Sequence, residues 1–218
     1  MKRVVFVISG GEIADETVVR AGMAEGDPAA IVSADGGARH LHALGVIPDV
    51  VIGDMDSLAP DLQRFFAGKG SRIIRHPQRK DETDTQLALE YALDLKPDEV
   101  WVFGALGGRL DHTLANLSLL ALGAERGIPI KIIDDWCEIF LVTGRGAIEG
   151  KPGQTVSLFP FSGPVTGIDL EGFEYPLANA AMEFGRPYGI SNRLVGLSGT
   201  ITVSSGQLLV IRYKRPVS

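Results

Sequence analysis

The sequence has few of the residues that define several common protein classes. Its 218 residues include one cysteine, Cys137, so the chain can form neither an intramolecular disulfide nor a zinc site built from cysteines. The four histidines do not form an H-E-x-x-H motif, which removes the commonest helical zinc site. No apolar run approaches the roughly 20 residues that a membrane helix needs. Cys137 is therefore expected to be an ordinary buried residue.

Positive charge is also scarce. Lys and Arg number 21 against 27 Asp and Glu, which gives a net charge of −6. A nucleic-acid backbone is bound by clustered Lys and Arg, so a broad nucleic-acid surface is not expected. A small anionic substrate is still compatible with this negative net charge, because a bound metal ion makes the local electrostatic potential positive. The first apolar run, residues 4–8, is too short for a signal-peptide core, and we expect a cytoplasmic protein.

Short apolar runs alternate with helical segments in the first part of the chain. Strands are predicted over residues 4–8, 30–33, 50–52, 72–74, 100–103 and 130–133. Helices are predicted over residues 38–44, 83–95 and 111–125. This alternation with short connections favours an α/β domain with a parallel sheet and helices on both faces. We assign it to residues 1–134.

The pattern changes near residue 135. Short apolar runs such as 155–159, 199–203 and 208–213 are separated by Gly, Pro and Ser, and no long helical pattern occurs. This composition predicts a second, all-β domain, a sandwich or a barrel, over residues 135–218. The polar segment 204–207 is typical of a hairpin connection between the last two runs.

Aspartates gather where the predicted strands end or the predicted helices begin. They are Asp35, Asp54, Asp56, Asp81, Asp84 and Asp111. Each could be a helix cap or a turn residue by itself. Ligands of parallel sheets bind at the carboxyl ends of the strands, however, so we expect these carboxylates to converge on one rim. The pair Asp54 and Asp56 is costly without a cation between them, and an all-carboxylate site favours magnesium.

Two glycine turns follow predicted strands and precede predicted helices. They are residues 35–37 and residues 104–109, the second ending in Arg109. Glycine lets the backbone approach a phosphate closely, and Arg109 offers a fork of donors to it. Neither turn matches the Walker or the dinucleotide-binding pattern. Carboxylates, glycine turns and an arginine together favour metal-assisted phosphoryl-type transfer, in which a carboxylate accepts the proton of the nucleophile.

Five segments, in order, carry a resemblance to the thiamine pyrophosphokinase (thiamine diphosphokinase) family. They are residues 34–38 (ADGGA), 53–57 (GDMDS), 81–86 (DETDTQ), 107–112 (GGRLDH) and 191–194 (SNRL). The resemblance implies an α/β domain that binds ATP, followed by a β-sandwich that binds thiamine. It also implies transfer of pyrophosphate from ATP to the hydroxyl of thiamine, with AMP released. A homodimer is implied as well, with thiamine between the α/β domain of one subunit and the β domain of the other.

The same resemblance assigns roles to individual residues. The implied magnesium ligands are Asp54, Asp56 and Asp84. Asp81 and Asp111 are the further catalytic carboxylates, with Asp111 as proton acceptor. The implied nucleotide-binding residues are Asp35, Gly36, Gly37, Thr85, Gln86, Gly108 and Arg109. Those implied to bind thiamine are Tyr175, Ser191 and Asn192, the last two through its pyrimidine.

The chain departs from the family at one position. Many members carry a tryptophan in the β domain that stacks on thiamine, whereas this chain has no tryptophan beyond Trp136. Tyr175 is the nearest counterpart, and its ring can hold a cationic thiazolium, though less strongly. The alternative is that Phe173 and Tyr175 are core or hairpin residues.

Two other functions stay open. A hydroxymethylpterin pyrophosphokinase would use the same magnesium chemistry on a different alcohol. A non-catalytic sensor of thiamine diphosphate or of a nucleotide would keep binding alone, but clustered carboxylates are a stability cost that a passive binder does not need.

Overall fold

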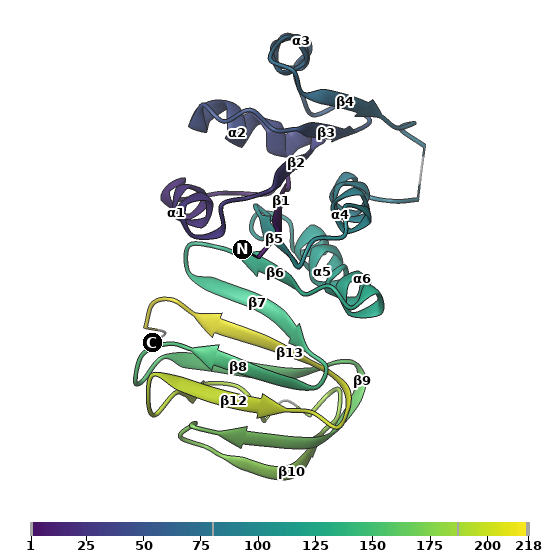
Figure 1. Ribbon diagram of the computed structural model, residues 1–218. Coiled ribbons are helices and arrows are strands. Elements are labelled where there is room, and N and C mark those ends of the chain that lie inside the picture. The colour runs from purple at the N-terminus through teal and green to yellow at the C-terminus, as the bar shows by residue number, and fades with distance from the viewer. Residues whose placement is uncertain (1, 80, 187, 217–218) are drawn as a thin grey trace. The chain divides into compact units, whose positions relative to one another are not determined.

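The computed structural model describes residues 2–79, 81–186 and 188–216 (Figure 1). The chain divides into two compact units, residues 1–135 and 136–218. Within the described ranges, no helix is long and apolar enough to cross a bilayer. Cys137 is buried, as expected.

The first unit is built on a parallel sheet. Its described strands are β1 (Val4–Ile8), β2 (Ala30–Ala34), β3 (Val50–Gly53), β4 (Arg72–Arg75), β5 (Glu99–Phe103) and β6 (Ile130–Ile133). They lie in the order β4-β3-β2-β1-β5-β6, and their pairings are all parallel. The chain runs outward from β1 to β4 and then returns to place β5 on the other side of β1. A crevice at the carboxyl ends of β1 and β5 is where such a sheet binds ligands.

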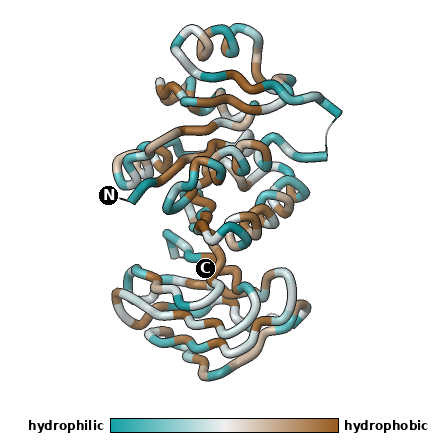
Figure 2. The backbone as a smooth tube through the Cα atoms, turned by 45° about the vertical axis from the view of Figure 1, so that its right-hand side comes forward, coloured by the Kyte–Doolittle hydropathy of each residue, from teal (hydrophilic) through white to brown (hydrophobic). Residues whose placement is uncertain are grey.

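Helices cover both faces of this sheet, as predicted. They are α1 (Thr17–Gly26), α2 (Ala38–Leu44), α3 (Pro60–Gly68), α4 (Asp84–Asp94), α5 (Leu110–Ser118) and α6 (Leu120–Arg126). Figure 1 shows α1 and α2 on one side of the strands and α4, α5 and α6 on the other. Every residue of β1 and of β5 is buried, which explains their unbroken apolar runs. Hydrophobic colour follows these strands in Figure 2.

The helices differ from the sequence prediction in two ways. The single helix predicted over 111–125 is two consecutive helices, α5 and α6, which meet at Leu119. The Ser118 hydroxyl donates to the carbonyl of Ala115 at 2.6 Å, and such back-bonding competes with the helical ladder. In addition, α1 and α3 were not predicted. Pro60 at the first position of α3 is a start signal that the pattern of apolar residues alone does not detect.

The second unit is an antiparallel β-sandwich, as the family resemblance implied. Its described strands are β7 (Cys137–Val142), β8 (Arg145–Glu149), β9 (Thr155–Glu171), β10 (Leu177–Met182), β11 (Asn192–Arg193), β12 (Ser198–Thr202) and β13 (Ser205–Tyr213). The 17-residue β9 pairs with β13 along its first part and with β10 and β12 along its last part. The apolar core between the strands includes Leu158, Ile168 and Val210.

The predicted hairpin at residues 204–207 is wrong. In the described structure β12 pairs with β8 and β9, whereas β13 pairs with β7 and β9. The connection between β12 and β13 bonds to other segments, because Val203 N–H donates to Gly144 and Ser204 N–H donates to Thr166. The polar segment therefore connects two strands, β12 and β13, that pair with different parts of β9. Local turn chemistry does not specify this long-range pairing.

Candidate active site

A cavity of about 530 Å³ opens in the first unit at the carboxyl ends of the strands. It lies where the strand order reverses around β1, the position expected for a ligand of a parallel sheet. Its walls come from the segments after β1, β2, β3 and β5 and from the start of α4. Among the lining residues are Ser9, Gly10, Gly11, Gly36, Arg39, His40, Asp84, Thr85, Gly108, Arg109, His112 and Asn116.

Glycine turns form the floor of the cavity by packing backbone against backbone. A Cβ at Gly11 would lie 2.4 Å from the Gly104 carbonyl oxygen, and one at Gly37 would lie 2.1 Å from the Ile8 oxygen. The Gly11 N–H also donates to Gly104 at 2.8 Å. Gly37, assigned to the nucleotide by resemblance, is buried, so the contribution that the structure shows for it is this close approach.

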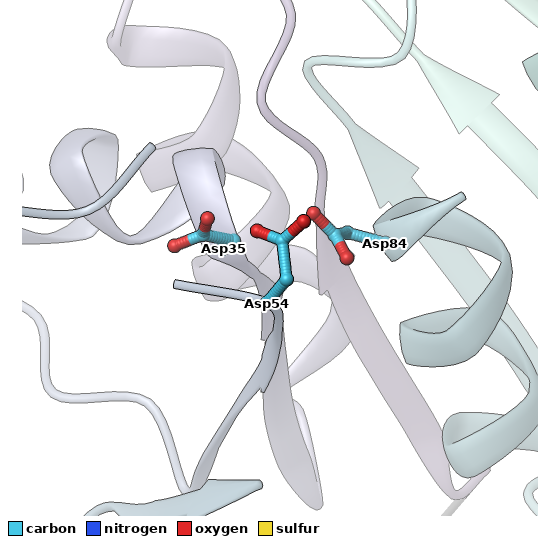
Figure 3. Close-up of side chains that lie close together, drawn as sticks. All are labelled: Asp35, Asp54 and Asp84. Carbon is cyan, nitrogen blue, oxygen red and sulfur yellow. The ribbon is translucent and has the colours of Figure 1, made fainter. Parts of the chain in front are cut away.

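Three carboxylates converge beside the cavity. Asp35, Asp54 and Asp84 each offer an oxygen, and these atoms lie within 4.8 Å of one another. Figure 3 shows the three side chains close together, each from a different element. Asp35 opens the short 3₁₀ helix after β2, Asp54 follows β3, and Asp84 is the first residue of α4. Of the six aspartates expected to converge on one rim, these three lie together, and Asp35 is one of them.

Both burial and neighbouring carboxylates disfavour the charged form of Asp35. It is fully buried, and its Oδ2 accepts the Ser57 N–H at 2.8 Å. Its Oδ1 is buried without a hydrogen-bond partner among the described residues. Burial raises the pKa of Asp35, and the charges of Asp84 and Asp54 raise it further, against the Ser57 hydrogen bond. A buried, partly unsatisfied carboxylate beside two others fits a divalent cation.

The turn that carries Asp54 is held from behind by α3. Met55 has a positive φ of 66°, a conformation that a non-glycine residue keeps only when its surroundings enforce it. Gln63 supplies that constraint, since its Nε2 donates to the carbonyls of Met55 at 3.2 Å and Leu58 at 2.6 Å. Arg75 in turn donates to the Gln63 Oε1 at 2.6 Å. Nothing in the sequence pattern singled out Gln63.

Asp56 and Asp81, assigned with the catalytic carboxylates by resemblance, lie outside the three-carboxylate group. Asp56 is exposed and accepts the Ser57 hydroxyl at 2.9 Å. Its N–H donates to Asp54 Oδ1 at 3.0 Å, so its backbone helps to orient Asp54. Asp81 is exposed at a bend before α4.

The start of α4 supplies the two expected polar residues after Asp84. Thr83 caps the helix, with its hydroxyl accepting the Gln86 N–H at 3.1 Å. Thr85 is buried, lines the cavity and shares a 2.6 Å hydrogen bond with the Ser9 hydroxyl. The Gln86 amide donates to Glu90 on the same helix at 2.9 Å.

Arg109 and Asp111 form a bidentate ion pair at the mouth of the cavity. Arg109 Nε and Nη2 donate to the two oxygens of Asp111 at 3.1 and 2.5 Å. This guanidinium lowers the pKa of Asp111 to about 2. Both side chains are exposed, so the pair is open to exchange of partners with a bound anion.

Two lining residues carried no sequence signal. Arg39 Nη2 donates to the carbonyl of Gly10 at 2.7 Å, and His40 Nε2 lies 2.8 Å from the carbonyl of Gly11. Burial lowers the pKa of His40, which favours the neutral ring with its N–H on Nε2. These contacts fix the turn after β1 against α2.

The second unit brings two of its three expected residues together. Phe173 is buried in the core, whereas Tyr175 is 61% exposed in the connection between the antiparallel strands β9 and β10. The alternative of core or hairpin residues thus describes Phe173 as a core residue and Tyr175 as a hairpin residue with an exposed ring. Tyr175 and Asn192 share two hydrogen bonds. Ser191 is exposed, with a positive φ of 60°, and its N–H donates to the Ser157 hydroxyl at 3.1 Å.

Known proteins similar to this chain share both units. The family model described as thiamin pyrophosphokinase, catalytic domain, matches residues 27–132, and that described as its vitamin B1 binding domain matches residues 147–208. Thiamine pyrophosphokinase of Bacillus subtilis is 35% identical over 183 residues, which cover 83% of this chain and 86% of that protein.

Solved structures agree with these sequence matches. The crystal structure of the Bacillus subtilis thiamine pyrophosphokinase aligns with a TM-score of 0.86 at 29% identity, over 98% of this chain and 100% of the other. The structure of thiamin pyrophosphokinase from Geobacillus thermodenitrificans aligns with a TM-score of 0.84 at 31% identity, over 97% and 98% of the two chains.

Proposed function

The chain belongs to the thiamin pyrophosphokinase family, and we propose that it transfers a pyrophosphoryl group from ATP to the hydroxyl of thiamine. The products are thiamine diphosphate and AMP. The observation that supports this most directly is the three-carboxylate group beside the cavity. The residues 1–134 then form the ATP-binding domain and residues 135–218 the thiamine-binding domain.

The three-carboxylate group is proposed to hold magnesium. Asp35, Asp54 and Asp84 offer hard oxygen ligands, and the unsatisfied Asp35 Oδ1 is relieved by a cation. A magnesium ion held by these residues would neutralise the charge that develops on the transferring group. Asp56 and Asp81 are proposed to act from outside the group, Asp56 by orienting Asp54 through its backbone N–H and Asp81 as an exposed carboxylate before α4.

The triphosphate is proposed to lie across the glycine turns. Gly36, Gly108 and Thr85 line the cavity, and backbone N–H groups in such turns bind phosphate oxygens. Arg109, which also lines the cavity, offers a positively charged guanidinium group that can donate two parallel hydrogen bonds to a phosphate. Asp35 and Gly37 belong to the same turn as Gly36, and Gln86 follows Thr85 on α4.

The proton of the substrate hydroxyl needs an acceptor, which we assign to Asp111. The thiamine oxygen forms a bond to the β-phosphorus while the bond from that phosphorus to the α–β bridging oxygen breaks. With its pKa held at about 2 by Arg109, Asp111 is a weak base. When Arg109 turns to the phosphates, the same movement binds the anion and makes Asp111 more basic.

Thiamine is proposed to bind through the second unit of a homodimer. The exposed ring of Tyr175 offers a face to the cationic thiazolium, and the exposed Ser191 offers a hydroxyl to the pyrimidine. Large apolar side chains are exposed on each unit and favour burial at a subunit interface. They include Leu110, Leu114, Phe184, Ile190, Val195 and Leu197. The cytoplasm supplies ATP and is the proposed location.

Product analysis tests this function. The purified chain is incubated with ATP, magnesium and thiamine, and AMP is separated from ADP. We expect equal amounts of AMP and thiamine diphosphate, and no turnover after magnesium is removed with a chelator. AMP formed only with hydroxymethylpterin would change the acceptor. Tight binding of thiamine diphosphate or nucleotide without turnover would identify a sensor.

A further inference from the structure

Asn192 is one of the few buried polar side chains of the second unit, with 5% exposure. Its carboxamide group is hydrogen-bonded to the backbone of nearby residues. The Oδ1 accepts the N–H of Tyr175 at 3.1 Å and that of Arg193 at 2.8 Å, and the Nδ2 donates to the carbonyl of Tyr175 at 2.8 Å. A buried carboxamide is tolerated when it is bonded in this way, and little of it remains for a ligand.

These hydrogen bonds lie at the end of a short antiparallel backbone pairing. The segment that ends at Tyr175 runs antiparallel to residues 192–195. Val195 N–H donates to Gly172 at 3.0 Å, Phe173 pairs with Leu194, and Glu174 N–H donates to Arg193 at 2.8 Å. In this register Asn192 is the next partner, opposite Tyr175.

The backbone of Asn192 is occupied elsewhere. It pairs with Val156 of β9, so it does not extend the ladder to Tyr175. The Asn192 side chain takes its place, because a carboxamide carries the same donor and acceptor as a peptide group. Pro176 follows and has no N–H to continue the pairing. The backbone of Tyr175 is thus fixed on this side by one side chain.

We propose that Asn192 is a positioning residue for thiamine binding, which presents the Tyr175 ring in one orientation instead of contacting the substrate. This inference rests on the proposed function. Tyr175 is 61% exposed, so its ring has few packing contacts of its own. Fixing its backbone beforehand reduces the conformational entropy that is lost when a ligand binds. Specificity for a cationic ring then depends on a residue that does not touch it.

Kinetics of paired variants test the proposal. Asn192→Asp keeps the size and the acceptor but removes the donor to the Tyr175 carbonyl. We expect it to raise the KM for thiamine about tenfold, on the order of the ordering cost of one side chain, with the KM for ATP unchanged. Asn179→Asp makes the same change at an exposed position of β10 and should leave both values unchanged. Equal rises in both KM values for Asn192→Asp would mean general damage and overturn the proposal.

A double variant separates positioning from contact. In a Tyr175→Ala background, Asn192→Asp should have no further effect on the KM for thiamine, because its partner's ring is gone. Independent, multiplying effects would show direct contact of Asn192 with thiamine and overturn the proposal.

Amide hydrogen exchange provides a readout that needs no substrate. We expect the Tyr175 amide to exchange faster in Asn192→Ala, which removes the acceptor of its N–H, while β13 keeps its protection. If the alanine variant does not fold, Asn192→Leu removes the same acceptor while filling a similar volume. Unchanged exchange at Tyr175 would overturn the positioning role of Asn192. A wild-type chain that forms no thiamine diphosphate would overturn the proposed function instead, whereas the exchange experiment tests the hydrogen bonds between Asn192 and Tyr175 independently of turnover.

Discussion

Gly53 packs against Asp35 so closely that a Cβ at position 53 would lie 2.6 Å from the Asp35 Cβ. The same atom would lie 3.0 Å from the Asp84 Cγ. Gly53 ends β3 directly before Asp54, and its φ of 156° is one that side chains rarely adopt. The close approach of Asp35 and Asp84 to this point therefore requires that the last residue of β3 have no side chain.

Replacing Gly53 tests this packing. Gly53→Ala should push Asp35 and Asp84 apart and lower kcat about 100-fold, the loss that a misplacement of about 1 Å can produce. Gly45→Ala is the matched control, since Gly45 also has a positive φ but nothing lies within 4 Å of its Cβ. It should lose stability without losing activity. A Gly53→Ala enzyme with normal kcat would show that the group tolerates displacement.

The carboxylates themselves are expected to separate into two classes. Asp54→Asn and Asp84→Asn should each lower kcat at least about 100-fold, and Asp56→Asn should cost less because its carboxylate is exposed outside the group. Steady-state kinetics at saturating magnesium gives the comparison. An Asp56→Asn enzyme as slow as Asp54→Asn would place Asp56 among the ligands.

Asp35→Asn should lose activity and yet gain stability. The variant removes a buried charge that lies beside other carboxylates and whose Oδ1 has no hydrogen-bond partner among the described residues. In thermal unfolding without magnesium, we expect its midpoint at or above that of the wild type. Magnesium should raise the wild-type midpoint, because a ligand of the native state stabilises it, and should not raise that of the variant. Equal responses to magnesium would remove Asp35 from the metal site.

Gln63 should matter for catalysis although it lies behind the site. Gln63→Leu removes the donor to Met55 and Leu58, and the turn that carries Asp54 then loosens. We expect kcat to fall about tenfold, because catalytic groups must be held to within a fraction of an ångström. Arg64→Ala, the neighbouring exposed position on α3, should leave kcat unchanged. The same loss in both variants would point to damage of α3 as a whole.

The Arg109–Asp111 pair makes a prediction about titration. In Arg109→Ala the pKa of Asp111 should rise from about 2 toward its ordinary value of 3.8, measured by NMR of the side-chain carboxyl. The pair contributes stability above pH 3.8 that is lost as the pH falls through about 2, and its exposure keeps that contribution small. The KM for ATP should rise about tenfold as a charged hydrogen bond to phosphate is lost. An unchanged pKa would mean that the pair does not form in solution.

The sequence predicted the sheet and its acidic rim because both follow from local patterns. Continuous apolar runs such as residues 4–8 and 100–103 mark strands that are buried on both faces, and aspartates directly after such runs are easy to find. Which carboxylates meet depends on strand order. Asp35 joins Asp54 because β2 and β3 are neighbours in the sheet, and no local pattern contains that information.

Long-range hydrogen bonds explain the rest of the differences. Gln63 and Arg39 carry no signal in the sequence, and Asn192 is expected from it only to bind thiamine. Each acquires its structural role by bonding backbone outside its own helix or strand. The hairpin at 204–207 failed for the same reason, since the partners of β12 and β13 are set by the long strand β9.

Both terminal phosphates of ATP are proposed to move to thiamine in one transfer. Incubation of the enzyme with magnesium, thiamine and ATP labelled with ³²P at the β position tests this transfer. We expect the label in thiamine diphosphate and unlabelled AMP. Label in ADP, with thiamine carrying a single unlabelled phosphate, would contradict pyrophosphoryl transfer.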